Sequence, residues 1–589
     1  MCGIHFSLSQ QEFCCPNDQL IQLLRNRGPD YINNERVRVP RKNGNDYYIS
    51  FTSTVLGLRG EQVICQPFKN KAESLFFCWN GEAWKINTHV IVNNDGKVIF
   101  DLLQKASSIQ STSEATVEVL RTLRSISGPF AFVFYDHIHR QLYFARDRLG
   151  RRSLLYKDKN DNTLLELCSI SDPLDGSWEE LETDGLYQLS LTEDQSLAKY
   201  HFPSSLQPGK FLSGLQNHKW FNTKDLNCFT KWEPNLGVFN MSIPTEQYVM
   251  NTDAKSVETL HKLLYKSLQL RILHIPPPSN IENASHVRVA ILFSGGLDCT
   301  VLARLADDIL PHDQEIDLLN VAFENPRVIQ AAKNVKLPTK DKVFNEIEDC
   351  PYESCPDRKT GRRSWEELQK VCSKRVWRFV AINIPFSETM AHRQILLNLI
   401  HPHNTEMDLS IAYALYFASR GSGLASLNNQ MTPTMYATPA RVLLSGFGAD
   451  ELFGGYTRHT TIFSRTGFSG LLNELKLDYD RLGKRNLGRD DRIISNWGKE
   501  ARFPFLDERL VRWAIEAPVL EKCGFRSPYN LDNTECPNLN LEPGKLILRL
   551  LSYKLGMIQL STEKKRAIQF GARTAKMRTG KIKGTTLVM

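Results

Sequence analysis

A cysteine at the second position has the chemistry of an N-terminal nucleophile. Cys2 follows Met1, and removal of an initiator methionine before such a small residue leaves the cysteine with a free α-amino group. The pKa of an unperturbed α-amine is about 7.7–8.0, so part of it is neutral near pH 7. The amine lies on the same residue as the thiol and can take its proton. We therefore regard Cys2 as a candidate nucleophile.

A glycine-rich turn suited to phosphate follows an apolar run later in the chain. Residues 289–293 are apolar, and Ser294, Gly295, Gly296 and Asp298 come next, before a helical pattern. Paired glycines permit a tight turn and a close approach of the backbone to phosphate, and the start of the helix presents free N–H groups. Ser294 can donate its hydroxyl, and Asp298 supplies an oxygen ligand for Mg²⁺. The Gly-Lys-[Ser/Thr] ending of a Walker A loop is absent.

The elements that must position these residues fall into two groups. Up to about residue 205 the chain is β-rich, and short strands separated by turn residues favour antiparallel sheets packed in layers. From residue 287 onward strands alternate with helices, which indicates a parallel α/β sheet. The strands are expected at 47–52, 75–79, 130–135 and 141–145 in the first group and at 289–293, 318–323 and 442–444 in the second.

These patterns predict two domains. The first covers residues 2–205, and a connection with several prolines follows over 206–250. The second covers 251–589 and begins with a helical pattern near Val257. Within it we expect an insertion at about 324–375 and a basic tail at about 572–589.

Composition and charge narrow the class of protein. The chain has 589 residues, more than the ~100–200 of one domain. Its formal net charge is +8, and a positive rim around a nucleotide site explains the basic C-terminal region better than nucleic-acid or membrane binding. No run reaches the about 18 apolar residues of a membrane span, and no secretory signal is evident. Irregularly spaced cysteines favour reduced thiols, so we expect a cytoplasmic protein.

An ordered set of short motifs accompanies Cys2. In this order the motifs resemble those of class II glutamine amidotransferases, over about residues 1–160. The resemblance implies an α+β domain with a four-layer αββα fold of the Ntn-hydrolase kind. The motifs are Cys2-Gly3-Ile4, Arg27-Gly28-Pro29-Asp30, Leu58-Arg59-Gly60, Asn80-Gly81-Glu82, Asp95, residues 128–132 and residues 145–150.

The same resemblance implies roles in glutamine binding. Arg59 would bind the α-carboxylate through its two-pronged guanidinium, and Asp95 would bind the α-ammonium group, with Glu82 in the same pocket. The Asn80 side chain and the Gly81 N–H would donate hydrogen bonds to the oxyanion. Taken singly, Asn80-Gly81 also fits a plain hairpin turn, and Arg59 also fits a surface arginine.

The second region resembles the asparagine synthetase family. Residues 294–298 after an apolar strand are similar to the loop of enzymes that cleave ATP to AMP and pyrophosphate. Residues 442–456 read Val-Leu-Leu-Ser-Gly-Phe-Gly-Ala-Asp-Glu-Leu-Phe-Gly-Gly-Tyr and resemble asparagine synthetases themselves. This implies that Ser445 and Gly446 contact ATP, that Asp450 joins Asp298 as a Mg²⁺ ligand, and that Glu451 is a general base at the acceptor.

Three positions depart from the asparagine synthetase pattern, although residues 488–492, 498–507 and 565–571 resemble a eukaryotic, asparagine synthetase domain-containing subfamily. Cys299 stands where serine is usual, and a thiol is a weaker donor. Phe447 replaces a glutamate. Ala567 occupies the place of a lysine that neutralises charge on the leaving phosphate, a kind of contact that contributes about 10²–10³ in rate. Lys565 and Arg566 lie within a turn of Ala567 and are candidate substitutes, and of the two we take Lys565 as the catalytic residue.

Three functions are consistent with these residues. In the first, Cys2 releases ammonia from glutamine, an internal channel carries it, and ATP with Mg²⁺ activates aspartate as β-aspartyl-AMP, giving asparagine. The second keeps both half-reactions with another carboxylate as acceptor, and Phe447, Ala567 and the insertion motivate it. The third is a non-catalytic binding or assembly protein, motivated by the missing lysine. Retention of Cys2, Asp298 and Glu451 favours an enzyme whose partners are small molecules.

Overall fold

The computed structural model divides the chain into two compact units. The first comprises Met1–Asn235, Asn398–His403 and Leu482–Lys499, and the second comprises Leu236–Leu397, Asn404–Arg481 and Glu500–Met589. Parts of the expected connection (206–214, 221–235, 246, 247 and 249), insertion (336–349) and tail (578–582 and 589) lie outside the described residues. The structure describes residues 1–41, 44, 46–157, 163–173, 175–192, 215–220, 236–245, 248, 250–277, 287–335, 350–427, 432–526, 541–577 and 583–588.

Two antiparallel sheets form the centre of the first unit. Within the described residues each has six strands, in the orders β13-β11-β12-β1-β3-β2 and β15-β14-β10-β9-β5-β4. The strands of the first sheet are β1 (Gly3–Ser9), β2 (Tyr31–Val39), β3 (Tyr47–Val55), β11 (Leu155–Lys157), β12 (Thr163–Cys168) and β13 (Glu179–Glu180). Those of the second are β4 (Phe68–Lys69), β5 (Leu75–Gly81), β9 (Phe130–Asp136), β10 (Gln141–Arg146), β14 (Gly185–Ser190) and β15 (Leu215–Lys219).

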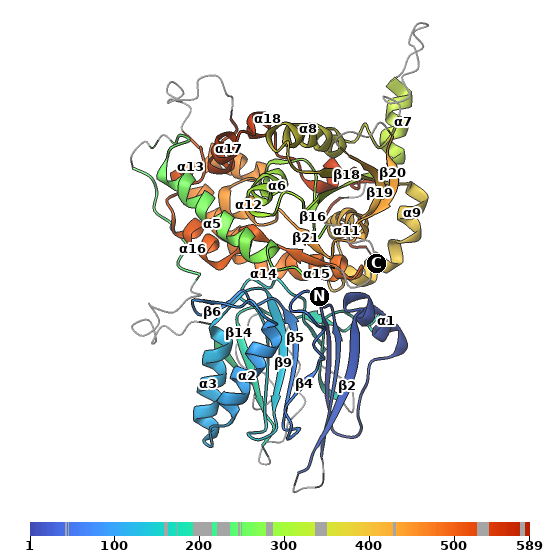
Figure 1. Cartoon of the computed structure of the whole chain (residues 1–589), viewed down its shortest axis with the longest axis vertical. Coiled ribbons are helices and arrows are strands. Elements are labelled where there is room, and N and C mark those ends of the chain that lie inside the picture. Colours follow the sequence, from blue (N-terminus) through green and yellow to red (C-terminus); the bar gives the residue numbers. More distant parts are fainter. Residues whose placement is uncertain are drawn as a thin grey trace. The chain divides into compact units, whose positions relative to one another are not determined.

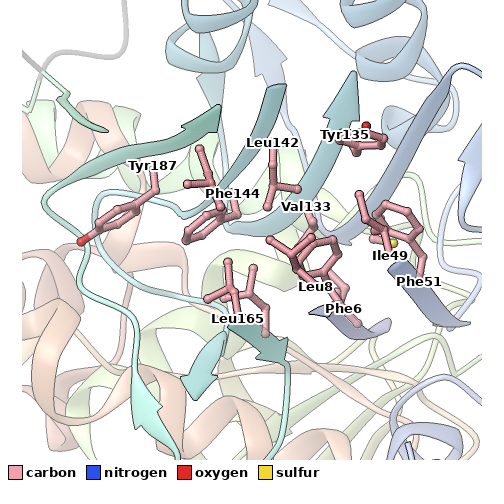
Figure 2. Packing of buried hydrophobic residues seen from close by; sticks show 14 of the residues in the cluster. Phe6, Leu8, Ile49, Phe51, Val133, Tyr135, Leu142, Phe144, Leu165 and Tyr187 are labelled. Carbon is pink, nitrogen blue, oxygen red and sulfur yellow. The ribbon is translucent and has the colours of Figure 1, made fainter. Parts of the chain in front are cut away.

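The two sheets pack face to face. Because side chains alternate along a strand, Phe6 and Phe51 of the first sheet meet Val133 and Tyr135 of the second in one buried cluster (Figure 2). On its other face the second sheet packs against α2 (Asp95–Ser107) and α3 (Thr112–Arg124). Both faces of β9 are therefore covered, which is why its sequence is a continuous apolar run rather than an alternating one.

Helix α1 (Asp18–Arg27) covers the outer face of the first sheet. The Leu24 carbonyl accepts a hydrogen bond from the Thr54 hydroxyl at 2.7 Å, and Thr54 belongs to the face of β3 that points away from the second sheet. The layers therefore run helix, sheet, sheet, helix, which confirms the expected αββα fold. Smaller elements of this unit are β6 (Lys85–Ile86), β7 (His89–Val90), β8 (Ile126–Ser127), α14 (Leu482–Arg485) and α15 (Leu487–Ser495).

A mixed seven-stranded sheet forms the centre of the second unit, within the part of the chain that is described. Its order is β20-β19-β18-β17-β16-β21-β22, and the five strands from β18 to β22 in that order are parallel. This confirms the expected α/β fold; β19 and β20 add an antiparallel edge. The strands are β16 (Val289–Leu292), β17 (Ile316–Phe323), β18 (Trp377–Ile384), β19 (Ser422–Ser426), β20 (Thr434–Ala437), β21 (Val442–Leu444) and β22 (Glu500–Arg502).

Helices cover both faces of this sheet (Figure 1). None of the helices in the described residues is long and apolar enough to cross a membrane. The helices are α5 (Lys255–Ile272), α6 (Leu297–Ile309), α7 (Pro326–Val335), α8 (Pro356–Val371), α9 (Phe386–Ala391), α10 (Arg393–Ile400), α11 (Glu406–Arg420), α12 (Ala449–Phe453), α13 (Thr457–Asp480), α16 (Glu508–Glu516), α17 (Leu546–Lys554), α18 (Ile558–Ser561) and α19 (Ile568–Gly571).

The strand order of this sheet points to a place for a ligand. From β16 the chain crosses to β17 on one side, and it later returns to place β21 on the other side. Open parallel sheets bind ligands at such a reversal, beyond the carboxyl ends of the two strands. The glycine-rich turn follows β16, and the segment with Asp450 and Glu451 follows β21.

Candidate active sites

Cys2 lies at one end of the space between the two sheets of the first unit. By the two-residue period of strands, its side chain belongs to the same face of β1 as Ile4, and Asn80 belongs to the same face of β5 as Cys78. Gln66 joins the two strands, since its amide nitrogen donates to the Cys2 thiol at 3.8 Å and its amide oxygen accepts from the Trp79 N–H at 2.8 Å. Gln66 was not predicted, because it belongs to no motif and no regular pattern.

Asn80 has a buried side chain without a protein partner. It is fully buried, and within the described residues neither its amide oxygen nor its amide nitrogen makes a hydrogen bond. Buried polar groups are nearly always hydrogen-bonded, so an unsatisfied amide on the inner face of β5 suits a donor to a bound ligand. At neighbouring Gly81 a Cβ would lie 2.7 Å from the Pro129 oxygen, which explains the glycine.

Arg59, Glu82 and Asp95 gather around Ala83. The Arg59 Nε and a Glu82 carboxylate oxygen are 2.7 Å apart, and both side chains are buried. Arg59 Nη1 also donates to the Ala83 oxygen at 3.3 Å, while one Asp95 oxygen accepts from the Ala83 N–H at 2.7 Å and from the Trp79 indole at 3.0 Å. The structure thus brings three of the four predicted glutamine-binding residues together and gives each of these three a partner within the protein, whereas Asn80, the fourth, has none among the described residues.

The turn after β16 packs tightly against helix α8. Gly295 has a φ of +78°, and a Cβ there would lie 2.4 Å from the backbone of Gly361. The Ser364 hydroxyl donates to the Gly295 oxygen at 2.7 Å, and the Gly296 N–H donates to Ser294 Oγ at 3.3 Å. Helix α8 therefore holds this turn in place, although it lies inside the stretch that the sequence suggested as an insertion.

The turns after β16 and β21 meet, as the strand order indicates. A Cβ at Gly446 would lie 2.7 Å from the Asp298 Cβ. The Ser445 N–H donates to the Arg502 oxygen at 3.0 Å, and its hydroxyl oxygen accepts from the Phe447 N–H at 3.3 Å. The structure thus brings together the predicted ATP-binding residues of both turns.

Two lysines join the carboxylates of this site. Lys545 Nζ lies 2.7 Å from an Asp298 oxygen and 2.6 Å from an Asp450 oxygen, and Lys565 pairs with the other Asp450 oxygen. Burial alone would raise the pKa of Asp450, but the charges of Lys545 and Lys565 hold it well below its ordinary value. The predicted metal ligands and Lys565 therefore form one charged cluster.

Lys545 was not predicted. It precedes α17 with a left-handed φ of +56°, and only tertiary structure brings it to the cluster. A Cβ at Gly455 would lie 2.1 Å from both the Lys545 Cε and an Asp450 oxygen. That contact explains the glycine at position 455, but no spacing in the sequence reveals it.

Glu451 has the character of a group that exchanges protons near neutral pH. Burial, followed by the adjacent charge of Asp450, raises the pKa of its carboxyl to about 7. The Tyr456 hydroxyl donates a hydrogen bond to it. A general base is most effective when its pKa is near the working pH.

The three departures from the family pattern have visible consequences. The Cys299 thiol donates to the oxygen of Gly296, the residue that caps the start of its own helix, at 3.3 Å. The ring of Phe447 packs against Phe503, with centroids 6.2 Å apart. Ala567 directly precedes α19, and Lys565, two residues earlier, reaches Asp450 instead.

Asp298 and Asp450 fit one common way of holding magnesium. Within the described part of the chain, no three His, Cys, Asp or Glu side chains are grouped to hold a metal by themselves. Magnesium is usually held by one or two carboxylates together with substrate phosphates and water. Two carboxylates joined by one ammonium group, beside a turn suited to phosphate, agree with that mode.

Two family models match the chain. One, described as "Glutamine amidotransferase domain", matches residues 1–219, and the other, "Asparagine synthase", matches residues 466–549. The chain is 32% identical to asparagine synthetase domain-containing protein 1 from Bos taurus, over 98% of this chain and 95% of that protein. The chain belongs to the asparagine synthetase domain-containing family.

A second member of this family and a more distant asparagine synthetase are also similar to the chain. An asparagine synthetase domain-containing protein from Saccharomyces cerevisiae is 32% identical, over 97% of this chain and 91% of that protein. Asparagine synthetase [glutamine-hydrolyzing] from Gallus gallus is 23% identical, over 88% of this chain and 77% of that protein. The family recognised from the motifs is thus confirmed, with an amidotransferase domain and a synthetase domain in one chain.

Proposed function

We propose that the chain is a glutamine-dependent asparagine synthetase that uses ATP and Mg²⁺. The observation that carries this proposal is the meeting of two turns at the reversal point of the parallel sheet, where Asp298, Asp450, Lys545 and Lys565 form one cluster. We assign the glutaminase to the first unit, which includes α15 and, beyond the expected end at residue 205, strand β15 paired with β14; we assign the synthetase to the second unit.

In the glutaminase, the Cys2 thiol attacks the amide carbon of glutamine. Its proton passes to the α-amine, and collapse of the tetrahedral intermediate releases ammonia and leaves a thioester that water hydrolyses to glutamate. Asn80 and Gly81 donate to the oxyanion, and the unsatisfied amide of Asn80 supports this role. Arg59, Glu82 and Asp95 bind the charged end of glutamine.

In the synthetase, Ser294, Gly295, Gly296, Ser445 and Gly446 bind the phosphates of ATP. A side-chain oxygen of aspartate attacks the α-phosphorus, and the bond to pyrophosphate breaks. Ammonia then attacks the acyl carbon, and AMP leaves with the electrons of the acyl–oxygen bond.

The charged residues assist both steps. Lys545 and Lys565 offset the negative charge that develops on pyrophosphate, and Glu451 accepts the proton that ammonia loses. Asp298 and Asp450 would hold Mg²⁺, which supplies further positive charge against the phosphates.

A second candidate changes only the acceptor. Phe447 packs against Phe503, so an apolar ring stands where asparagine synthetases carry a glutamate. An acceptor acid without the α-ammonium group of aspartate suits such a ring better.

Glutamine labelled with ¹⁵N in its amide tests the proposal. We expect ¹⁵N-asparagine when the full-length chain, with Cys2 at its N-terminus, is incubated with this glutamine, aspartate and Mg-ATP. Cys2→Ala should abolish labelling from glutamine but preserve synthesis from added ammonia, whereas Asp298→Asn should abolish both.

Other outcomes are equally informative. Release of ¹⁵N-ammonia from glutamine, together with ATP–pyrophosphate exchange that does not depend on aspartate, would favour another acceptor. A chain inert in both half-reactions would overturn the proposal.

A further inference from the structure

Helix α15 belongs to the first unit, although its residues come more than 460 positions after the first strand. Its Asp491 pairs with Arg27, the last residue of α1, at 2.8 Å, and both side chains are fully buried. Arg27 Nη1 also donates to the Ser495 hydroxyl at 2.6 Å. One face of α15 therefore binds both terminal nitrogens of this guanidinium.

The same guanidinium reaches the candidate nucleophile. Arg27 Nε donates to the main-chain oxygen of Cys2 at 3.3 Å. A guanidinium is a rigid, planar group, so contacts that fix its two terminal nitrogens also fix the direction of Nε. Asp491 and Ser495 thus act on Cys2 through a single intervening side chain.

Helix α15 is itself held firmly in the unit. Arg492 Nη1 donates to the Ser153 hydroxyl at 2.8 Å and lies 3.2 Å from a Glu180 oxygen, and its Nε donates to the Leu399 oxygen at 3.0 Å. Asp491 also accepts from the Ser153 N–H at 3.2 Å. Arg27 is therefore bound to a fixed frame, and its position does not depend on Cys2.

We propose that Asp491 and Ser495 are positioning residues for the Cys2 nucleophile. They hold Arg27, and Arg27 holds the Cys2 main chain where its thiol faces the amide of glutamine. This inference rests on the proposed glutaminase activity. It adds that the glutaminase is incomplete without a helix encoded beside the synthetase strand β22.

Glutaminase kinetics of the full-length chain test this inference. Asp491→Asn keeps the size of the side chain and removes its charge, so Cys2 loses its fixed orientation while Arg59, Glu82 and Asp95 stay in place. We expect kcat to fall about 10- to 100-fold, the range for a displaced reacting group, with KM for glutamine within about twofold of wild type. Ser495→Ala removes one contact and leaves the charge, and we expect a fall of about threefold on the same grounds.

A control variant separates positioning from general damage. Asp175→Asn removes a 2.6 Å ion pair with Lys157 in the same unit without touching Arg27, and its kcat should stay at the wild-type value. If Asp491→Asn does not fold, Ser495→Ala alone decides the matter.

The failures of the two proposals are distinguishable. A wild-type chain whose Cys2 does not react with a glutamine-mimicking electrophile would overturn both. If Cys2 of the wild-type chain reacts but kcat is unchanged in Asp491→Asn and Ser495→Ala, only the positioning role is overturned. A rise in KM with constant kcat would overturn it too, since that pattern indicates lost substrate binding.

Discussion

At the scale of single residues, the buried amide of Asn80 suggests a conflict between stability and activity. Leaving a buried polar group unsatisfied costs about 1–3 kcal/mol, so Asn80→Ala should not lower the midpoint of thermal unfolding. We expect the same variant to lose about 10²–10³ in glutaminase turnover, as removal of an oxyanion donor does elsewhere. Melting curves and turnover, measured on one preparation, check both halves. A fall in the melting midpoint would show that Asn80 is mainly structural.

The second residue-scale prediction concerns Lys545. Lys545→Met removes the ammonium shared by Asp298 and Asp450, and we expect ATP–pyrophosphate exchange to fall about 10²–10³-fold while Cys2 labelling is unchanged. Lys522→Met is the matched control, because Lys522 is equally buried in the same unit but donates to the Ala514 oxygen. Equal losses in the two variants would contradict a specific role for Lys545.

Residues of the candidate site can be predicted from the sequence where they follow strands or belong to a family motif, as Lys565 does. Asp298 and Asp450 each come just after an apolar run, and the ends of parallel strands meet at one edge of a sheet. Lys545 comes 247 positions after Asp298 and Gln66 lies in an irregular segment. Their places depend on packing that no local pattern records.

At the scale of elements, the conformation of the turn between β16 and α6 requires glycine at position 295 but not at position 296. Gly295→Ala would force a Cβ to 2.4 Å from the Gly361 backbone at a φ of +78°, whereas a Cβ at Gly296 would meet only Ser294 Oγ, at 3.3 Å. We expect Gly295→Ala to destabilise the second unit by at least about 1–3 kcal/mol and to abolish exchange. Gly296→Ala should fold like wild type. Denaturant unfolding compares them, and equal stability would contradict the tight packing on α8.

Helix α8 also makes stability depend on pH. Burial, offset in part by Arg566 and Lys565, raises the pKa of Asp357 from 3.8 to about 7. The folded chain therefore keeps this proton to a higher pH than the unfolded chain, so the free energy of unfolding falls as pH rises from 3.8 to about 7. Asp357→Asn should remove this slope and raise the urea midpoint at about pH 8 but not at about pH 4. An equal shift of the urea midpoint at both pH values would contradict this assignment of the pH dependence to Asp357.

The main elements can be predicted because their patterns are strong. The expected strands at 75–79, 130–135 and 141–145 are β5, β9 and β10, and the helix expected near Val257 is α5. The antiparallel edge was not predicted. Strand β19 reads Ser-Gly-Leu-Ala-Ser, which has no β-branched residue and no clear alternation, so pairing with β18 decides its conformation.

At the scale of the whole molecule, the first unit is not a continuous stretch of sequence. A fragment of residues 1–220 lacks α15 and leaves Arg27 without its carboxylate, and breaking a buried pair in this way costs about 3–5 kcal/mol. We expect this fragment to be poorly soluble. Co-expression with residues 236–589, which contain α15, should restore its solubility. The measurement is the yield of soluble fragment when it is expressed alone and when it is co-expressed with residues 236–589. A stable fragment with glutaminase activity would show that the unit completes itself without α15.

The distance along the chain between Arg27 and Asp491 also sets a delay during protein synthesis. The two residues are 464 positions apart, so at about 5–20 residues per second the ribosome makes Asp491 roughly 20–90 s after Arg27. During that interval α1 and β1 can form, but the guanidinium has no carboxylate to pair with. A nascent chain would therefore acquire an ordered Cys2 only when synthesis is nearly finished. Under the proposed function, glutamine would then be spared from hydrolysis by chains that do not yet have a site to use the ammonia.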